Sequence, residues 1–431
     1  MLRVLTRRIE KKTRLLLGRN QFGFRKGCGT RDAIGVVRTL CERSMEHDND
    51  VYICFVDFEK AFDRVNWVKM FEILKDLHVD WKDRRLLQDL YMRQEAVVRI
   101  ADGESNPGII GRGVRQGCLI SPLLFSIYAE VMMIEAFGDS ENLDEEDIDI
   151  EDFEDGIVVG GKIVRDVRFA DDQGMVSGTE RGLQKLMNKL NDTAKKFNMK
   201  INVQKTKTMV VSRNEGRTVK IKIDDQEIEQ VSNFKYLGSL ISEDGRCLID
   251  VKTRIALAKD AFNKRKEFLT GGLSGTLKKR MVKVLVWPVA IYGCETWTLK
   301  KEEKDKLEAL EMWLWRKLEK VNWSDRISNE EVLTMVNESR CLIETIRQRK
   351  KNWVGHVLRG NGLLRDVLEG RMVEKARVGR RREKMLDDLM IVPIEGSKKK
   401  EKVLSYQKLK IKAEDRSGWR SWVPGTCQEA D

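Results

Sequence analysis

Two adjacent aspartates, Asp171 and Asp172, interrupt a stretch that otherwise has the composition of a buried β-hairpin. The segment RFADDQGMV at 168–176 places them between two short apolar runs that each resemble a strand. Neighbouring carboxylates raise the cost of ionising each other. The chain must therefore either expose both to water or compensate them with a cation. Taken alone, the pair favours a solvated turn, and a divalent-cation site is the alternative.

Another carboxylate lies at the end of a second predicted strand. The segment VYICFVDF at 51–58 is rich in β-branched and aromatic residues and brings Asp57 to its carboxyl end. If the two regions are neighbours, Asp57 joins Asp171 and Asp172 at one edge of a sheet. Hard oxygen ligands without imidazole or thiolate select Mg²⁺, with Mn²⁺ as an alternative, over Zn²⁺. Two such ions can activate an attacking hydroxyl and stabilise a leaving pyrophosphate.

Hydrophobic periodicity up to about residue 245 predicts strands mixed with helices. Ser121 should be the N-cap of an apolar helix, because Pro122 needs no N–H donor at the first helical position. From Glu180, apolar residues repeat every three or four positions, which predicts a helix with one core face. We also expect a helix at 2–16 and strands at 162–170, 174–178, 199–204, 206–212 and 234–242. This order favours an α+β fold, a sheet with helices on one face.

After about residue 247 the pattern becomes helical and rich in tryptophan. We expect a separate helical domain, with helices at 249–269, 275–290, 302–319 and 329–352 and most of its tryptophans in the core. Beyond Gly360 the chain is irregular and strongly basic, with KARVGRRREK at 375–384 and KKKEK at 398–402.

The charge balance favours a polyanionic partner. The formal net charge is +12, although Asp139–Asp155 holds eleven acidic and no basic residues and is expected to be a solvated loop. Such an excess suits nucleic acid or an acidic membrane surface, and a merely cationic soluble protein is the alternative. The longest apolar run, VLVWPVAIY at 284–292, is too short to cross a membrane. The eight cysteines form no C-x-x-C pair, which favours reduced intracellular thiols over a zinc site.

Six motifs occur in an order that resembles the blocks of a reverse transcriptase of the non-LTR (LINE-type) retrotransposon class. The motifs are QFGFRKGCGTRDA at 21–33, FVDFEKAFDRV at 55–65, RQGCLISPLLF at 115–125, FADD at 169–172, INVQKTK at 201–207 and FKYLGS at 234–239. The resemblance covers roughly 15–245 and continues more loosely through AIYGCETWTL at 290–299 and WVGHVLR at 353–359.

The resemblance implies a right-hand polymerase fold. Residues 1–245 would form partial fingers and a palm, in which an antiparallel sheet carries helices on one face. Residues 246–352 would form a helical thumb-like domain, and 353–431 a basic C-terminal region.

The resemblance also implies roles for individual residues. Asp57, Asp171 and Asp172 would bind metal as catalytic residues, and Lys205 would neutralise or protonate the leaving pyrophosphate. The incoming nucleotide would contact Phe58, Phe62, Gln116 and Gly117, with the Phe62 ring leaving no room for a ribose 2′-hydroxyl. The primer and template would contact Arg25, Lys26, Arg115, Phe234, Lys235, Tyr236, Leu237 and Gly238.

Each of these residues also has an ordinary structural interpretation. Phe62 alone would be a core residue, Lys205 a solvated charge, Gln116 and Gly117 a loop, and the segment 234–238 an edge strand. Glu59 and Asp63 are not assigned to metal, because neither is expected on the same face as Asp57, and Asp63 better fits the start of a helix.

The activity implied is that of an RNA-directed DNA polymerase, which extends a DNA 3′-hydroxyl on an RNA template with deoxynucleoside triphosphates. We expect it in the nucleus, the cytoplasm or both. The first motif begins only about twenty residues into the chain, and no endonuclease or Cys/His knuckle is recognisable. We therefore expect a shortened copy that does not nick target DNA by itself. An inactive remnant that only binds nucleic acid is one alternative. An RNA replicase is another, and it fits Phe62, RQG and FADD less well.

Overall fold

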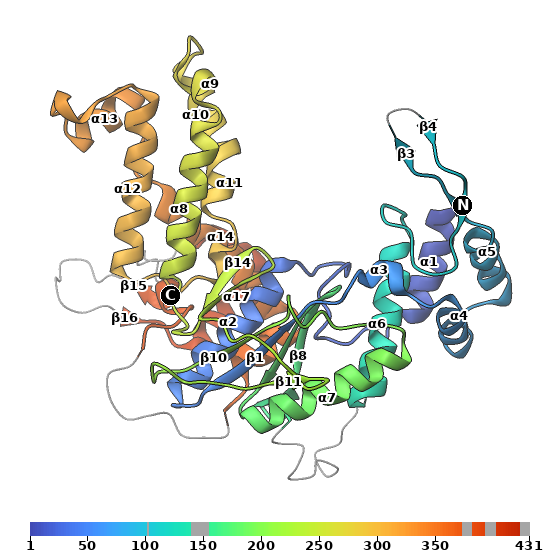
Figure 1. Cartoon of the computed structure of the whole chain (residues 1–431). Coiled ribbons are helices and arrows are strands. Elements are labelled where there is room, and N and C mark those ends of the chain that lie inside the picture. The colour runs from blue at the N-terminus through green and yellow to red at the C-terminus, as the bar shows by residue number, and fades with distance from the viewer. Residues whose placement is uncertain (101–102, 139–154, 373–381, 393–401, 423–431) are drawn as a thin grey trace. The chain divides into compact units, whose positions relative to one another are not determined.

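The computed structural model describes residues 1–100, 103–138, 155–372, 382–392 and 402–422 (Figure 1). The predicted acidic loop lies outside these residues except for Asp155. The chain folds into two compact units, which are described separately. The first contains Met1–Ala33, Asn49–Ser232 and Gly370–Val373, and the second contains Ile34–Asp48, Asn233–Glu369 and Glu374–Asp431.

The first unit is organised around a four-stranded antiparallel sheet in the order β10-β1-β9-β8. Its strands are β1 (Val51–Val56), β8 (Asp166–Phe169), β9 (Asp172–Ser177) and β10 (Lys207–Val211). Strands β8 and β9 form the predicted hairpin, and β1 pairs with β9 on one side and β10 on the other. β1 therefore occupies a central position, which agrees with its nearly continuous apolar sequence and burial.

Two helices pack beside this sheet and supply much of the core of the first unit (Figure 1). They are α6 (Ser121–Phe137) and α7 (Glu180–Lys196), and α7 contacts β1, β9 and α6. Cys54 and Val56, two positions apart in β1, join the same core cluster as apolar residues of both helices. The helix predicted from Glu180 is confirmed, and Thr179 caps it by accepting from the N–H of Gly182.

Shorter elements complete the first unit. The helices are α1 (Leu2–Thr13), α3 (Ala61–Arg64), α4 (Trp67–Asp76) and α5 (Trp81–Tyr91). The strands are β2 (Glu95–Ala96), β3 (Arg99–Ile100), β4 (Gly103–Glu104), β5 (Gly108–Ile109), β6 (Ile157–Val159), β7 (Lys162–Val164), β11 (Lys222–Ile223) and β12 (Gln226–Glu227).

The second unit is mainly helical. It contains most of α2 (Thr30–Glu46) and the hairpin β13 (Asn233–Tyr236) and β14 (Ser239–Ser242). Its helices include α8 (Leu248–Asn263), α9 (Lys266–Thr270), α10 (Gly275–Met281), α11 (Trp287–Ala290), α12 (Lys301–Leu318), α13 (Asn329–Val336), α14 (Leu342–Arg359) and α15 (Leu363–Glu369). The later elements are α16 (Asp387–Met390), β15 (Ile391–Val392), β16 (Lys402–Val403), α17 (Tyr406–Glu414) and α18 (Arg416–Ser421). Trp287, Trp297 and Trp315 are buried in one core cluster, as expected.

Six local predictions were wrong. The strand predicted at 162–170 is divided into β7 and β8, which belong to different sheets, and the helix predicted at 249–269 is divided into α8 and α9. Ile120 rather than Ser121 is the N-cap of α6, and the Ser121 hydroxyl instead contacts the hydroxyl of Tyr91 at 3.3 Å. The segment 199–204 forms only an isolated bridge through Ile201 before it turns, and 234–242 is a hairpin rather than one strand. The helix predicted at 329–352 is divided, because Asn337 ends α13 in a left-handed conformation.

Within the described ranges, no helix has both the length and the apolar character that a membrane span requires.

Candidate active site

The register of the central sheet brings two of the predicted catalytic aspartates opposite each other. Val56 of β1 pairs with Gln173 of β9, so the next antiparallel position joins Asp57 and Asp172. Side chains at opposite positions of an antiparallel pair point to the same face of the sheet. Asp171 lies one residue earlier, in the turn that follows Ala170, whose φ of 59° is left-handed. The sheet thus brings Asp57 and the Asp pair to one edge, as predicted.

The three carboxylates influence one another electrostatically. Partial burial and, to a lesser extent, the charges of Asp171 and Asp57 together raise the pKa of Asp172 to about 6. Burial also raises the pKa of Asp171, to which Asp57 contributes. Asp171 and Asp172 nevertheless remain exposed by surface area, and the Asp57 side chain is 41% exposed. The sheet edge therefore concentrates negative charge at a place that solvent and ligands can reach.

The donor chemistry of this edge suits a hard divalent cation, because a cation between carboxylates offsets their mutual repulsion. In the residues that the structure describes, however, no three or more His, Cys, Asp or Glu side chains are gathered tightly enough to hold a metal ion. The ligand type fits, and metal binding by Asp57, Asp171 and Asp172 stays a prediction.

Lys205 reaches the same edge from the loop before β10. Its ammonium lies 4.0 Å from a carboxylate oxygen of Asp57. The loop is fixed to β1 by two hydrogen bonds, in which the Asp57 N–H donates to the hydroxyl of Thr206 and the Asn202 N–H donates to the Asp57 carbonyl. The Lys205 side chain is 71% exposed. A mobile cation is thus placed beside the carboxylates, where a negatively charged leaving group could also be contacted.

Phe62 lies between two other aromatic rings. It stacks on Phe125 of α6 with ring centroids 4.4 Å apart, and Phe24 approaches edge-on at 6.5 Å. Its ring is only partly buried, while Phe24 is 57% exposed. The Phe62 carbonyl also accepts from the N–H of Val114 at 2.8 Å, which ties α3 to the loop ahead of α6. The ring is therefore rigidly supported and still reaches the surface.

The RQG segment forms an exposed turn beside this aromatic cluster. Arg115, Gln116 and Gly117 are all exposed, and Gly117 has a φ of 80° that favours glycine. A Cβ at Gly117 would meet no atom within 4 Å, so the space over its backbone is open. Phe58, in contrast, is 6% exposed and belongs to the core cluster of the first unit. Its side chain is not presented to a nucleotide.

The turn that carries Asp171 is held from the QFGF segment. The side-chain oxygen of Gln21 accepts from the N–H of Gly23 at 2.8 Å and from the N–H of Ala170 at 3.1 Å. A Cβ at Gly23 would lie 2.4 Å from the Ala170 nitrogen, so this close approach requires glycine. Gln21 itself is fully buried. Sequence reasoning missed Gln21 as a site residue, because its partner Ala170 is 149 positions away.

The basic residues of the same segment differ in exposure. A guanidinium nitrogen of Arg25 donates to the Gly18 carbonyl at 2.7 Å, whereas Lys26 is exposed.

The first unit also contains a buried ionic network that the sequence did not reveal: Arg168 contacts Glu130 at 2.9 Å and Asp166 at 2.6 Å. All three are at least 96% buried. The network anchors β8, which leads into the turn that carries Asp171.

Glu59 and Asp63, the two acids left unassigned, are accounted for locally. Glu59 forms ion pairs with Arg64 at 2.9 Å and Lys200 at 2.8 Å. Asp63 lies in the first turn of α3 and is exposed, as expected of a helix-start residue.

The remaining candidates, Phe234 to Gly238, lie in the β13–β14 hairpin of the second unit. Leu237 and Gly238 form the two-residue turn, with φ of 47° and 82°. The Leu237 carbonyl accepts from the Tyr292 hydroxyl at 2.9 Å, and the Gly238 carbonyl accepts from Arg254. The hairpin is therefore anchored at its tip within its own unit. A role of this hairpin in holding the primer stays a prediction.

Comparison with known proteins shows which family this chain resembles. The family described as "Reverse transcriptase (RNA-dependent DNA polymerase)" matches residues 1–241. A putative transposon-derived protein of Caenorhabditis elegans is 23% identical over 47% of this chain and 74% of its own length. The RNA-directed DNA polymerase from mobile element jockey of Drosophila melanogaster is 23% identical over 70% of this chain and 32% of its own length.

Other matches extend this list. The Pol polyprotein from type-1 retrotransposable element R2 of Nasonia vitripennis is 24% identical over 59% of this chain and 24% of its own length. The chain thus spans a third or less of the jockey and R2 proteins. Among solved structures, the apo telomerase of Candida tropicalis is 13% identical with a TM-score of 0.38, covering 86% of this chain and 61% of that one.

Proposed function

This chain belongs to the reverse transcriptase (RNA-dependent DNA polymerase) family, and we propose that it is the RNA-directed DNA polymerase of a non-LTR (LINE-type) retrotransposon. The observation that carries the proposal is the sheet edge where Asp57 faces Asp172 across β1 and β9, with the Lys205 ammonium 4.0 Å from Asp57. In this reaction the 3′-hydroxyl of a DNA primer attacks a deoxynucleoside triphosphate that is paired with an RNA template.

The three aspartates are the residues that would hold divalent metal. Bound Mg²⁺, or Mn²⁺ in its place, would supply activation of the primer hydroxyl and stabilisation of the leaving pyrophosphate. Asp57, Asp171 and Asp172 provide only oxygen ligands, and a bound cation would offset the repulsion from Asp171 and Asp57 that contributes to the raised pKa of Asp172.

The remaining residues position the reactants. Lys205 stands beside Asp57, where its ammonium would neutralise or protonate the pyrophosphate as it departs. The Phe62 ring, braced by Phe125, would exclude a ribose 2′-hydroxyl from the sugar site. The exposed Arg115, Gln116 and Gly117 would contact the nucleotide and template, since the open space over Gly117 lets another backbone or base approach closely. Phe58 would contribute only through its backbone, since its ring is buried.

We further propose that residues 1–245 act as partial fingers and palm, 246–352 as a thumb-like domain and 353–431 as a basic nucleic-acid-binding region. Arg25, Lys26 and the hairpin residues Phe234, Lys235, Tyr236, Leu237 and Gly238 would hold template and primer. The net charge of +12 supports binding of both strands.

Primer extension tests the proposal. The purified chain is incubated with an RNA template annealed to a DNA primer, the four deoxynucleoside triphosphates and MgCl₂. We expect extension that EDTA abolishes and that Asp171→Ala removes, while the variant retains the affinity of the wild-type chain for the duplex. The exposed Asp225→Ala in the β11–β12 turn serves as a matched control and should extend normally. Binding of the duplex without extension by the wild-type chain would show instead a nucleic-acid-binding remnant.

A further inference from the structure

Helix α5 of the first unit carries a basic and aromatic surface that no residue of the proposed active site uses. Its inner face buries Asp83, Leu87 and Tyr91, which are spaced four residues apart along the helix. The outer positions Trp81, Arg85, Gln88 and Met92 follow the same helical spacing and are all exposed. The inner face of α5 therefore packs into the core, and the outer face remains available for a ligand.

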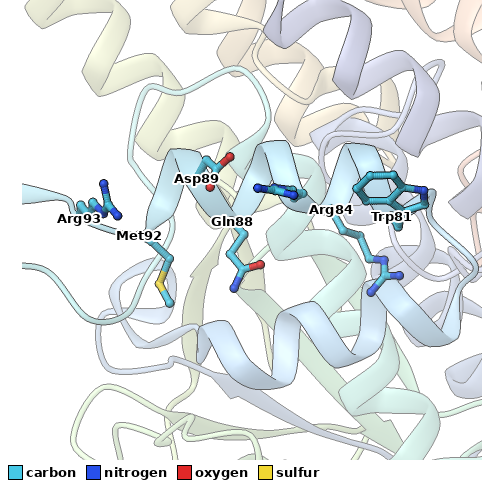
Figure 2. Close-up of a pocket in the computed structure, with 7 residues that line it drawn as sticks. Trp81, Arg84, Gln88, Asp89, Met92 and Arg93 are labelled. Atoms are coloured by element: carbon cyan, nitrogen blue, oxygen red, sulfur yellow. The ribbon is translucent and has the colours of Figure 1, made fainter.

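The outer face lines a surface pocket of about 610 Å³. Trp81 lies at one end of the helix and Met92 and Arg93 at the other, with Gln88 and Asp89 between them (Figure 2). Eleven residues of helix separate Trp81 from Met92, which corresponds to about 16 Å along the axis. The surface is thus long enough to contact several successive residues or nucleotides of an extended polymer.

The charge of this surface is positive. Arg84, Arg85 and Arg93 line the pocket, and Asp89 is the acidic residue among them. In the described part of the chain, neither Arg85 nor Arg93 forms an ion pair, and both are exposed. Guanidinium groups bind phosphate through two parallel hydrogen bonds, so unpaired arginines on one helix face suit a phosphodiester backbone.

The apolar residues of this surface are unusual for a solvated helix face. Trp81 is 58% exposed and Met92 48% exposed, so two large apolar side chains lie on one solvent-facing surface. The Lys82 ammonium lies 5.9 Å over the Trp81 ring, so a base that stacks on this indole displaces Lys82 or uses the opposite ring face. A flat ring flanked by arginines is the arrangement that stacks an unpaired base while its phosphates are neutralised.

We propose that the outer face of α5 binds single-stranded RNA, with Trp81 stacking a base and Arg85 and Arg93 contacting phosphates. Bases inside a duplex are already stacked and could not reach Trp81, so the occupant is an unpaired stretch of RNA. The choice of RNA over DNA rests on the proposed function, in which RNA is the template.

Equilibrium binding tests the proposal on the full chain, with a fluorescently labelled 20-nucleotide RNA that has no internal pairing. Trp81→Ala should weaken binding about tenfold, while Trp81→Phe, which retains a stacking ring, should stay close to wild type. Arg85→Gln combined with Arg93→Gln should also weaken binding. It should reduce the slope of log affinity against log salt by about 1.4, because each phosphate contact on a single strand contributes about 0.7. Arg181→Gln combined with Arg3→Gln, two exposed changes on α7 and α1, is the charge-matched control.

Three results would overturn the proposal. One is unchanged RNA affinity in Trp81→Ala and the double arginine variant, with circular dichroism showing that both are folded. A second is an equal loss of heparin binding in Trp81→Ala, since heparin has no bases to stack. The third is a loss of affinity for DNA of the same sequence without a loss for RNA.

Kinetic measurements distinguish an error in the proposed RNA site on α5 from an error in the proposed polymerase function. The α5 variants should raise the KM for the template-primer and leave kcat for extension unchanged, whereas Asp171→Ala should abolish extension and leave RNA affinity intact. A chain that never extends a primer but loses RNA affinity on Trp81→Ala retains the α5 site without the polymerase. A chain that extends normally and is unaffected by the α5 changes retains the polymerase alone.

Discussion

At the scale of single residues, Gln21 supports the turn that carries Asp171 and Asp172. Its oxygen accepts from two backbone N–H groups, those of Gly23 and Ala170, and Ala170 immediately precedes Asp171. Gln21→Met retains the volume and removes the acceptor, leaving two buried donors unsatisfied. Each such donor costs about 1–3 kcal/mol. We expect the free energy of unfolding to fall by about 2 kcal/mol or more.

The same substitution should slow primer extension roughly 10- to 100-fold, because misplacement of reacting groups by about 1 Å costs on that order. Urea unfolding and single-turnover extension measure the two effects. Gln21→Glu keeps an acceptor oxygen at this place and should recover part of the activity. Gln226→Met, an exposed change in β12, controls for the substituted residue type. Wild-type extension by Gln21→Met would show that the turn does not need this support.

Asp172 permits a prediction about pH. Its folded-state pKa is raised to about 6 from an ordinary value of 3.8, so the folded chain keeps a proton that the unfolded chain loses. Stability should therefore decrease as pH rises from about 4 through about 6. In EDTA, Asp172→Asn should melt at a higher temperature than wild type at pH 8, and the difference should shrink at pH 4. The gain should be modest, because Asp172 is exposed and solvent screens its charge.

Thermal unfolding at the two pH values checks this prediction, with exposed Asp225→Asn as the control that should not depend on pH in this way. Added Mg²⁺ should reverse the order of the two melting temperatures, because it stabilises only the chain that retains the carboxylate. An Asp172→Asn variant that is less stable than wild type at pH 8 in EDTA would contradict the electrostatic argument.

The residue-scale predictions succeeded where local pattern determines placement. Asp57 ends a strongly apolar strand and Asp171 and Asp172 interrupt a hairpin, so pairing of those strands was enough to bring them to one edge. Gln21 and the buried Arg168 network could not be found in this way. Their partners are defined by tertiary contacts, and a polar residue beside an apolar run does not reveal in sequence whether it is buried.

At the scale of elements, the β13–β14 hairpin shows how turn chemistry can mislead. The apolar run FKYLGSLIS resembles one strand because leucine is not a usual turn residue, yet Leu237 and Gly238 both adopt positive φ. A two-residue hairpin turn of this kind requires positive φ at both positions. Tyr292 and Arg254 hold the tip by donating to the carbonyls of Leu237 and Gly238, and such tertiary contacts cannot be read from sequence periodicity.

Substitutions of opposite effect test this hairpin. Gly238→Ala should lower the free energy of unfolding by about 1 kcal/mol, because a side chain in the left-handed region is strained and its Cβ would lie 3.4 Å from the Tyr292 ring. Leu237→Asn should raise it by about 0.5 kcal/mol, since asparagine tolerates this conformation. Denaturant unfolding measures both. Equal effects of the same sign would show that the turn conformation is not the source of strain.

At the scale of the whole molecule, the compact units are discontinuous in sequence. Residues 34–48, which precede β1 along the chain, pack with the helical second unit. Thr298 donates to Glu42 at 2.9 Å, and a Cβ at Gly35 would lie 2.9 Å from the Trp353 ring. Periodicity predicts that a helix has an apolar face, but it does not say which distant element covers that face. The α+β class was therefore predictable, and the membership of α2 in the second unit was not.

Asp250 holds this discontinuous unit together. Its buried carboxylate accepts from Arg38 at 2.9 Å, from the Ser239 hydroxyl at 2.7 Å, from the Leu240 N–H at 3.0 Å and from the Trp297 indole at 2.8 Å. It thereby links α2, β14 and α8 with the segment before α12. A carboxylate that is 1% exposed and receives four donors is compensated only while all of its partners remain in place.

Asp250→Ala should lower the free energy of unfolding by about 3–5 kcal/mol, because it leaves the Arg38 guanidinium buried without its counter-charge. Asp260→Ala on the same helix removes an exposed ion pair with Lys264 and should cost less than about 1 kcal/mol. Urea unfolding followed by circular dichroism distinguishes the two variants. Arg38→Met combined with Asp250→Ala should recover part of the stability lost in Asp250→Ala alone, since only Arg254, 3.8 Å from the Asp250 carboxylate in the wild-type chain, then lacks its counter-charge. If the double variant is the less stable of the two, the main task of Asp250 is to satisfy Ser239, Leu240 and Trp297 rather than Arg38.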